Sequence, residues 1–175
     1  MSQDVPDFSE LLRAANRTAV HLEMRDIYGV GEEAEDFAHF RRTGIHPDAD
    51  PAMADWGGWV SLVRETVGRG VVMRRARVVS EPVTDYIRFE HAGTVVNLAA
   101  GEEVRWLPRR LASDLALPGN DLWLIDDRLV MFHWFTGDGD WAGHEFHEDP
   151  ATVKMVADAF EAVWARATPH DQYRV

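Results

Sequence analysis

A run of β-branched and arginine residues at 71–79 is the strongest structural constraint in this chain. The run, Val-Val-Met-Arg-Arg-Ala-Arg-Val-Val, lies between a glycine and a Ser-Glu-Pro sequence, which is typical of a strand. Residues 82–92 follow as a helix with Pro82 at its first position, and residues 104–107 form a second strand-like run stopped by a proline. Because a helix separates the two strands, we expect them to be parallel neighbours in one sheet.

Three further strand-like segments follow at 121–126, 129–135 and 142–147. Two tight turns rich in aspartate or glycine separate them, so these strands are expected to pair as antiparallel neighbours. A last helix is predicted over residues 149–164, with apolar side chains at helical spacing. From residue 71 onward, the predicted order is therefore β-α-β-β-β-β-α.

The N-terminal part, residues 1–58, is expected to be mostly helical. Apolar side chains recur at helical spacing in residues 7–17, and a group of acids favours the start of another helix that runs through Phe40. Residues 19–25 could form a short strand. This part is expected to pack on the main domain, residues 59–175. The predicted fold class is α+β, with helices packed on a mixed sheet.

Composition limits the function classes that remain open. The chain has no cysteine, which excludes disulfides, thiolate zinc sites and a cysteine nucleophile. Its net charge is −12, so direct nucleic-acid binding is not expected, whereas a small ligand or a basic protein partner fits better. The sequence has no basic leader followed by an apolar stretch and no apolar run of membrane length, which predicts a cytoplasmic protein without membrane contact.

The arginine-rich strand and the helix after it form the predicted ligand- or partner-binding site. Arg77 and Arg105 lie on the two strands expected to be neighbours, so their guanidinium groups would form a fork for a carboxylate or phosphate. Ser80 and the backbone N–H groups after Pro82 would add donors at a helix N-terminus. The predicted site residues are Arg77, Ser80, Glu81, Tyr86, Arg88, Asn97, Arg105 and Asp126.

The same region allows two other interpretations. In a structural network, Glu81, Glu90 and Glu102 would neutralise the arginines, and the supply of acids favours this interpretation. In an enzyme for a small anionic substrate, Glu81 would be the general base, which requires a carboxylate with a raised pKa in a cleft. The clamp of that enzyme would be three arginines: Arg77, Arg88 and Arg105.

Metal binding and nucleophilic catalysis have weaker support. His144 and His147 carry metal-ligand chemistry but point to opposite faces of a strand, so only His133 and His147 could meet across the hairpin. No serine lies in Gly-x-Ser-x-Gly, and no phosphate loop with lysine occurs. We therefore predict no catalytic residue, no metal and no cofactor. Trp141, beside a Gly-Asp turn, is expected to be exposed and available to a partner.

Three motifs stand out in the sequence: Arg-Val-Val-Ser-Glu-Pro-x3-Tyr-x-Arg-Phe-Glu at 77–90, Asn-x3-Gly-Glu-x2-Arg-x-Leu at 97–107 and Asp-Leu-Trp-Leu-Ile-Asp at 121–126. Together they resemble an uncharacterised bacterial domain family that is common in Gram-positive bacteria of high GC content. Members are often encoded beside small helix-turn-helix regulators. The resemblance therefore implies a regulatory partnership but no reaction.

A more distant resemblance concerns the part after residue 71. Its strand order, its Ile-Asp-Asp turn and its closing Phe-x3-Trp-x2-Ala helix resemble half of a phospholipase D-type domain, which some transcription regulators use without catalysis. The catalytic motif of those hydrolases is His-x-Lys followed four residues later by Asp. The single lysine is Lys154, and residue 152 is threonine, so the motif is absent.

The favoured hypothesis is a non-enzymatic cytoplasmic regulatory or interaction protein. It would partner a helix-turn-helix regulator and could sense a small anionic ligand through the arginine region. The alternative is an enzyme acting on a small anionic substrate through the region of Arg77, Glu81 and Arg105. Mimicry of DNA by the acidic surface is a third hypothesis, which rests on the net charge alone.

Overall fold

A mixed sheet forms the centre of the computed structural model, which describes residues 7–29 and 31–175. Within these residues the sheet has seven strands in the order β6-β5-β4-β1-β2-β3-β7. The strands are β1 (Thr18–Glu23), β2 (Val72–Val79), β3 (Glu103–Pro108), β4 (Leu122–Ile125), β5 (Leu129–Phe135), β6 (Trp141–His147) and β7 (Thr168–Pro169). The helices are α1 (Phe8–Ala14), α2 (Ala34–Thr43), α3 (Trp59–Gly68), α4 (Asp85–Ala100) and α5 (Pro150–Arg166), with short 3-10 turns η1 (Gly31–Glu33) and η2 (Arg109–Leu111).

The crossover from β2 through α4 to β3 confirms the parallel pair predicted from the sequence, with Ala76 opposite Arg105. The helix begins at Asp85, later than predicted, because the Thr84 side chain accepts a hydrogen bond from the N–H of Ile87 and so caps it. It ends at Gly101, whose φ of 104° is accessible to glycine at little cost. The order from β2 to α5 is β-α-β-β-β-β-α, as predicted.

The N-terminal part contributes more than helices to the fold. Its strand β1 lies between β4 and β2 and is therefore at the centre of the sheet. It pairs in parallel with β2 and antiparallel with β4. The sheet is thus mixed, and residues 18–23 are part of the same core as the strands after residue 71.

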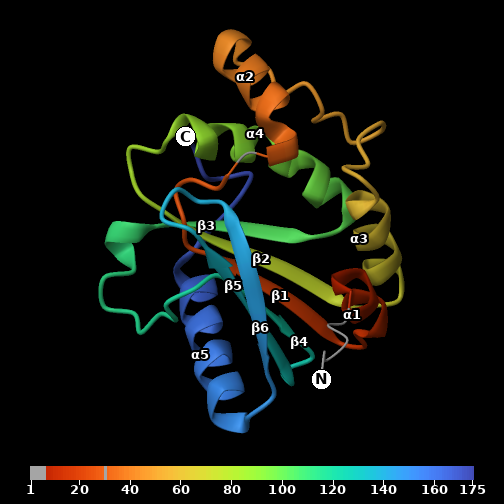
Figure 1. Cartoon of the computed structure of the whole chain (residues 1–175), viewed down its shortest axis with the longest axis vertical. Helices are drawn as coiled ribbons and strands as arrows, with labels where there is room; N and C mark the ends of the chain where they lie inside the picture. The colour runs from red at the N-terminus through yellow and green to blue at the C-terminus, as the bar shows by residue number, and fades with distance from the viewer. Residues whose placement is uncertain (1–6, 30) are drawn as a thin grey trace.

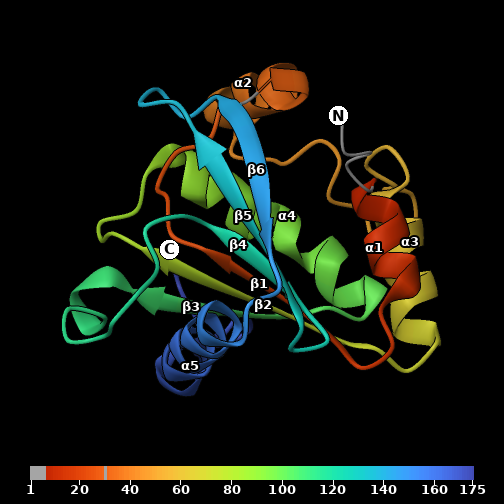
Figure 2. The same ribbon diagram turned by 60° about the horizontal axis from the view of Figure 1, so that its bottom comes forward.

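Helices cover both faces of the sheet. Figure 2 shows α5 on one face and α1, α3 and α4 on the other, while α2 projects beyond α4 in Figure 1. Strand β2 serves both faces because its side chains alternate: Ala76 and Val78 pack in a cluster with Phe160 of α5, and Met73 packs in a cluster with Val60 of α3. No helix in the described part of the chain is long and apolar enough to cross a membrane.

Candidate functional site

A cavity of about 710 Å³ opens on the face of the sheet that α1, α3 and α4 cover only in part. Strands β1, β2, β4, β5 and β6 contribute to its walls, and the loop before α3 closes one side. Most of its large side chains are aromatic: Phe8, Trp56, Trp59, Phe89, Trp123 and Trp141. Cavities of this size and character are typical of small-molecule sites.

Strand register explains why polar side chains gather on this face. His21 lies opposite Arg75 across the β1–β2 pair, and Glu23 lies opposite Arg77. On the other side of β1, His21 lies opposite Trp123 and stacks on it, with the ring centroids 4.2 Å apart. Because side chains at a spacing of two share one face of a strand, all five project towards the cavity side of the sheet.

Arg75 is held by two carboxylates at the floor of the cavity. Its Nε donates to Glu102 at 2.8 Å, and its Nη1 donates to Glu23 at 3.1 Å. The second oxygen of Glu102 accepts a hydrogen bond from Nδ2 of Asn97 at 2.7 Å. Burial opposes the charged form of Arg75, but the two carboxylates outweigh it and raise the pKa of Arg75. The network is therefore ionised and closely satisfied.

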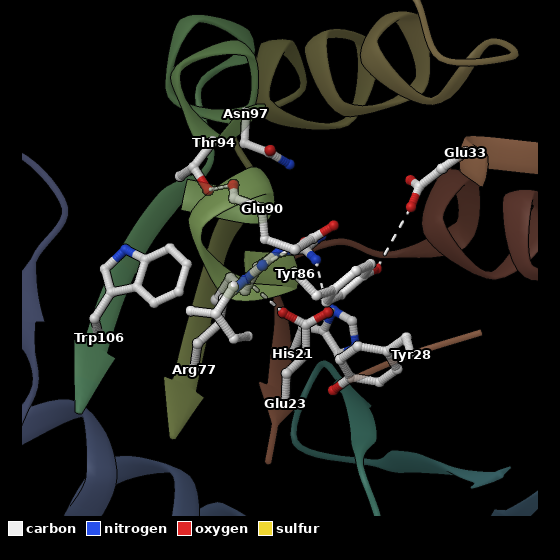
Figure 3. Close-up of polar contacts among 12 residues, drawn as sticks. His21, Glu23, Tyr28, Glu33, Arg77, Tyr86, Glu90, Thr94, Asn97 and Trp106 are labelled. Atoms are coloured by element: carbon white, nitrogen blue, oxygen red, sulfur yellow. Dashed lines mark hydrogen bonds and ion pairs between the residues drawn. The ribbon is translucent and has the colours of Figure 1, made fainter. Parts of the chain in front are cut away.

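Arg77 forms the second half of this network. Its Nε lies 2.8 Å from Glu23, and its Nη1 donates to Glu90 of α4. Its guanidinium carbon is 5.1 Å from the ring centroid of Trp106, which adds a cation–π contact. Figure 3 shows Arg77 between Trp106 and Glu23, with Glu33 joined to Tyr86 on the other side. Burial opposes the charge of Arg77, but Glu23 and Glu90 raise its pKa.

Carboxylates outnumber cations around the cavity. Glu33, Asp36, Asp48 and Glu90 line it, against Arg75 and Arg77. Glu33 is an exposed residue, yet the surrounding atoms remove part of its hydration and the charge of Glu90 adds to this effect, so the pKa of Glu33 is raised to about 7. The cavity mouth thus holds an acid that is half protonated near neutral pH.

Two imidazoles beside the cavity are uncharged at neutral pH. Burial lowers the pKa of His133 to about 4, and burial together with Arg75 lowers the pKa of His21 well below 6.5. Neither Nδ1 of His21 nor Nε2 of His133 has a hydrogen-bond partner among residues 7–29 and 31–175. Both rings are therefore buried neutral groups with unused hydrogen-bonding capacity.

The lowered pKa of His133 predicts a loss of stability in mild acid. Its contribution is complete above about pH 6.5 and is lost as the pH falls towards 4, because the unfolded chain binds the proton more tightly. For His133 alone, we expect the free energy of unfolding to fall by about 1 kcal/mol between about pH 7.5 and about pH 5.5. Urea denaturation across this range should show a smaller fall for His133→Gln, and an unchanged fall for His39→Gln on α2. Equal pH dependence in wild type and His133→Gln would contradict the assignment.

Three of the predicted site residues lie at or beside the cavity. Arg77 and Asn97 line it. Tyr86 is buried behind it, with its hydroxyl 3.4 Å from Glu33. Arg105 is on the other face of the sheet, because it is in register with Ala76 rather than with Arg77. There its Nη1 donates to the carbonyl of Trp164 at 3.1 Å, so the predicted fork of two arginines is wrong.

The other predicted residues have local structural contacts. The hydroxyl of Ser80 donates a hydrogen bond to the carboxylate of Asp26, and Arg88 forms an ion pair with Asp85 on the surface of α4. Glu81 is exposed, accepts from the hydroxyl of Tyr173 and pairs with Arg110. Asp126, at the β4–β5 turn, accepts from the backbone N–H groups of residues 16–18. The predicted clamp and base, Arg77, Arg88, Arg105 and Glu81, therefore do not share one site.

The histidine prediction also needs a correction. His133 is in register with His144, and both line the cavity, whereas His147 is opposite Val130. The described residues contain no group of three or more His, Asp or Glu side chains placed to hold a metal ion. Trp141 is 54% exposed, as predicted, and lines the cavity edge.

The sequence reasoning did not identify several cavity residues. His21 and Glu23 occupy alternate positions of a central strand, a pattern of polar residues at period two that is unusual in a buried strand. Glu33 carried no comparable signal, because an acid before a helix is common. Its role depends on the approach of Glu90 and Tyr86 from α4, which is a long-range contact.

The chain belongs to the DUF6879 family, a domain of unknown function, which matches residues 6–175. This agrees with the resemblance to an uncharacterised domain family that the sequence motifs indicated. No curated protein shows significant sequence similarity to the chain.

Solved structures confirm the resemblance to the phospholipase D fold. Nuc from Salmonella typhimurium, a phospholipase D family member, is similar with a TM-score of 0.53 and 11% identity, over 95% of this chain and 88% of Nuc. NucT from Helicobacter pylori gives a TM-score of 0.51 and 11% identity, over 92% of this chain and 87% of NucT. The archaeal chromatin protein TrmBL2 gives a TM-score of 0.48 and 14% identity over 91% of this chain, which spans 47% of TrmBL2. At these identities the similarity concerns the fold alone.

Proposed function

We propose that this protein is a non-enzymatic regulatory module that binds a small molecule in the aromatic cavity and partners a helix-turn-helix regulator. The observation that carries the proposal is the cavity of about 710 Å³, lined by six aromatic rings over a buried network of ion pairs. Its volume falls in the range of ligand sites, and a few fixed polar groups among rings are typical of specific binding.

The chemistry of the cavity supports binding without catalysis. The two arginines are neutralised by carboxylates of the protein itself, and the imidazoles of His21 and His133 have pKa values too low for general acid catalysis near neutral pH. Because both arginines are already paired with carboxylates of the protein, they are not free to bind or activate an anionic substrate. Paired arginines and neutral imidazoles of this kind suit a sensor.

An enzyme remains the second candidate because of one residue. The pKa of Glu33, about 7, is close to the optimum for a general base, and Glu33 lines the cavity. This role would replace the base predicted at Glu81. Conversion of a cavity-bound molecule by wild-type protein but not by Glu33→Gln would favour the enzyme.

Filling the cavity tests the binding function. His144 points into the cavity from the edge strand β6, so His144→Trp should occupy part of the volume. After incubation with deproteinised cell extract and removal of free molecules, mass spectrometry should find a small molecule on the wild-type protein and at least about tenfold less on His144→Trp. Glu145→Trp is the matched control because it introduces the same bulk at an exposed neighbouring position that does not line the cavity. Equal retention by all three proteins, or retention by none, would contradict the binding function.

The partner is tested separately. The net charge of −12 favours a basic protein surface and speeds encounter with it. Affinity purification of the tagged protein should recover a small helix-turn-helix protein in stoichiometric amount. If no such regulator is recovered, the proposed partnership is wrong. The proposed binding of a small molecule is then still tested by the cavity-filling variant.

A further inference from the structure

The charge around the cavity indicates the kind of ligand it accepts. Glu23 pairs with both Arg75 and Arg77, and Glu102 and Glu90 each pair with one of them, so carboxylates already exceed guanidiniums in the network. A further three carboxylates line the cavity without an ion pair among the described residues: Glu33, Asp36 and Asp48. The net negative charge of the cavity wall would therefore repel an anionic ligand and attract a cationic one.

The aromatic lining supplies the second feature. Trp59 and Trp123 make an edge contact, with an interplanar angle of 65° and ring centroids 5.9 Å apart. The guanidinium of Arg75 lies 5.9 Å from each of the two ring centroids. Trp56 and Phe89 add rings from the loop before α3 and from α4. Ring faces attract cations through their quadrupole, most strongly where water is excluded.

Two neutral imidazoles supply the third feature. His21 is 8% exposed and lines the cavity, yet its Nδ1 has no hydrogen-bond partner within residues 7–29 and 31–175. His133, which also lines the cavity, leaves Nε2 unpaired in the same way. Because burial keeps both imidazoles uncharged near neutral pH, neither adds a positive charge that would repel a cation.

We propose that the ligand of this cavity is a small organic cation, with an ammonium group carried on an apolar or aromatic body. The inference rests on the proposed binding function and names the ligand class. The ammonium group would lie near Glu33 and Asp36 at the mouth, and the apolar body would lie among the tryptophan rings.

Three probes of similar size and different charge test the ligand class. They are benzyltrimethylammonium, 2-phenylethanol and phenylacetate. Titration calorimetry with the full chain should give the tightest binding for benzyltrimethylammonium, about tenfold tighter than the neutral alcohol, and the weakest for phenylacetate. Quenching of tryptophan fluorescence should follow the same order, because four tryptophans line the cavity.

A carboxylate variant tests the assigned position of the charge. Glu33→Gln should weaken benzyltrimethylammonium on the order of tenfold, since it removes one carboxylate from the mouth. Glu35→Gln is the matched control, because Glu35 is exposed two residues further along the chain and does not line the cavity. It should leave the affinity unchanged.

The pH dependence gives a readout that a structural role for Glu33 would not produce. The probe itself does not titrate, and Glu33 faces Glu90 and Tyr86 of α4, Asp36 of α2 and Arg77 of β2. With a pKa of about 7 for Glu33, affinity for the quaternary probe should rise between about pH 6 and about pH 8 in the wild type. The rise should be absent in Glu33→Gln.

The outcomes separate the two proposals. Tighter binding of phenylacetate, or equal binding of the cation and the alcohol, would overturn the assignment of a cationic ligand and leave the binding function in place. Binding of no probe at millimolar concentration would also overturn the cation. In that case, retention of a molecule from cell extract would still support the binding function. If no molecule were retained either, both the cationic ligand and the binding function would be overturned.

Discussion

Replacing Glu102 with alanine is expected to lower the free energy of unfolding by about 3 to 5 kcal/mol. Glu102 is 2% exposed, and its carboxylate accepts from Nε of Arg75 at 2.8 Å and from Nδ2 of Asn97 at 2.7 Å. Without it, the buried guanidinium of Arg75 keeps only Glu23, and the amide of Asn97 loses its acceptor. The large effect arises because a charge and a donor remain buried without their partner. Urea denaturation followed by tryptophan fluorescence measures it.

Two variants separate this cause from a general effect of substitution. Glu103→Ala changes the adjacent, exposed residue at the start of β3 and should cost less than about 0.5 kcal/mol. Glu102→Gln keeps the shape and one acceptor while it removes the charge, so we expect an intermediate loss of about 1 to 3 kcal/mol. A Glu102→Ala protein within about 1 kcal/mol of the wild type would show that the buried pair contributes little.

Local sequence signals were enough to predict most of the fold. The β-branched run at 71–79, Pro82 before the helix and Pro108 at the end of β3 indicate strand, helix and strand in that order, and a crossover of this length makes the strands parallel. The aspartates of the β4–β5 turn likewise mark a tight connection. The central position of β1 was not predictable in the same way, because it depends on pairing with strands that are distant in sequence.

The site was less predictable than the fold because it depends on register. Arg77 and Arg105 are on adjacent strands, but a shift of one position in register moves a side chain to the other face of the sheet. The sequence indicates that both residues are in strands and does not define which residues are opposite each other. A structural network of the arginines with Glu81, Glu90 and Glu102 was one of the interpretations that the sequence allowed. Glu90 and Glu102 are part of the network, whereas Glu81 pairs with Arg110.

The cavity itself could not be derived from the sequence. Its aromatic residues come from separate elements, and their spacing is equally typical of a closed core, in which Trp56, Trp59 and Trp123 also take part. The space between them exists because α2 and the loop before α3 leave the middle of the sheet uncovered, a consequence of helix placement rather than of any motif. One signal is present in the sequence: the polar residues His21 and Glu23 alternate with apolar residues in a central strand, a pattern that marks a buried polar site.

Replacing Arg77 with methionine is the second substitution with a large expected effect, a loss of about 3 to 5 kcal/mol in the free energy of unfolding. Methionine keeps much of the packing volume against Trp106, so the loss measures the charge. Arg77 is 6% exposed and pairs with Glu23 and Glu90, whose carboxylates would then face each other with Arg75 as their remaining cation. Removing one excess charge should restore stability, so Arg77→Met combined with Glu90→Gln is expected to recover at least about 1 kcal/mol over the single variant.

Arg105→Met is the comparison that assigns this effect to the cavity face. It removes the same group from the neighbouring strand, but Arg105 lies over the Trp164 ring at 4.4 Å and donates to one carbonyl, without a carboxylate partner in the described chain. Its expected cost is about 1 kcal/mol, and the affinity for benzyltrimethylammonium should not change. Similar losses in the two variants would show that Arg77 acts by packing rather than by charge. A folded Arg105→Met protein that no longer bound the probe would instead place the ligand on the other face of the sheet and contradict the cavity site.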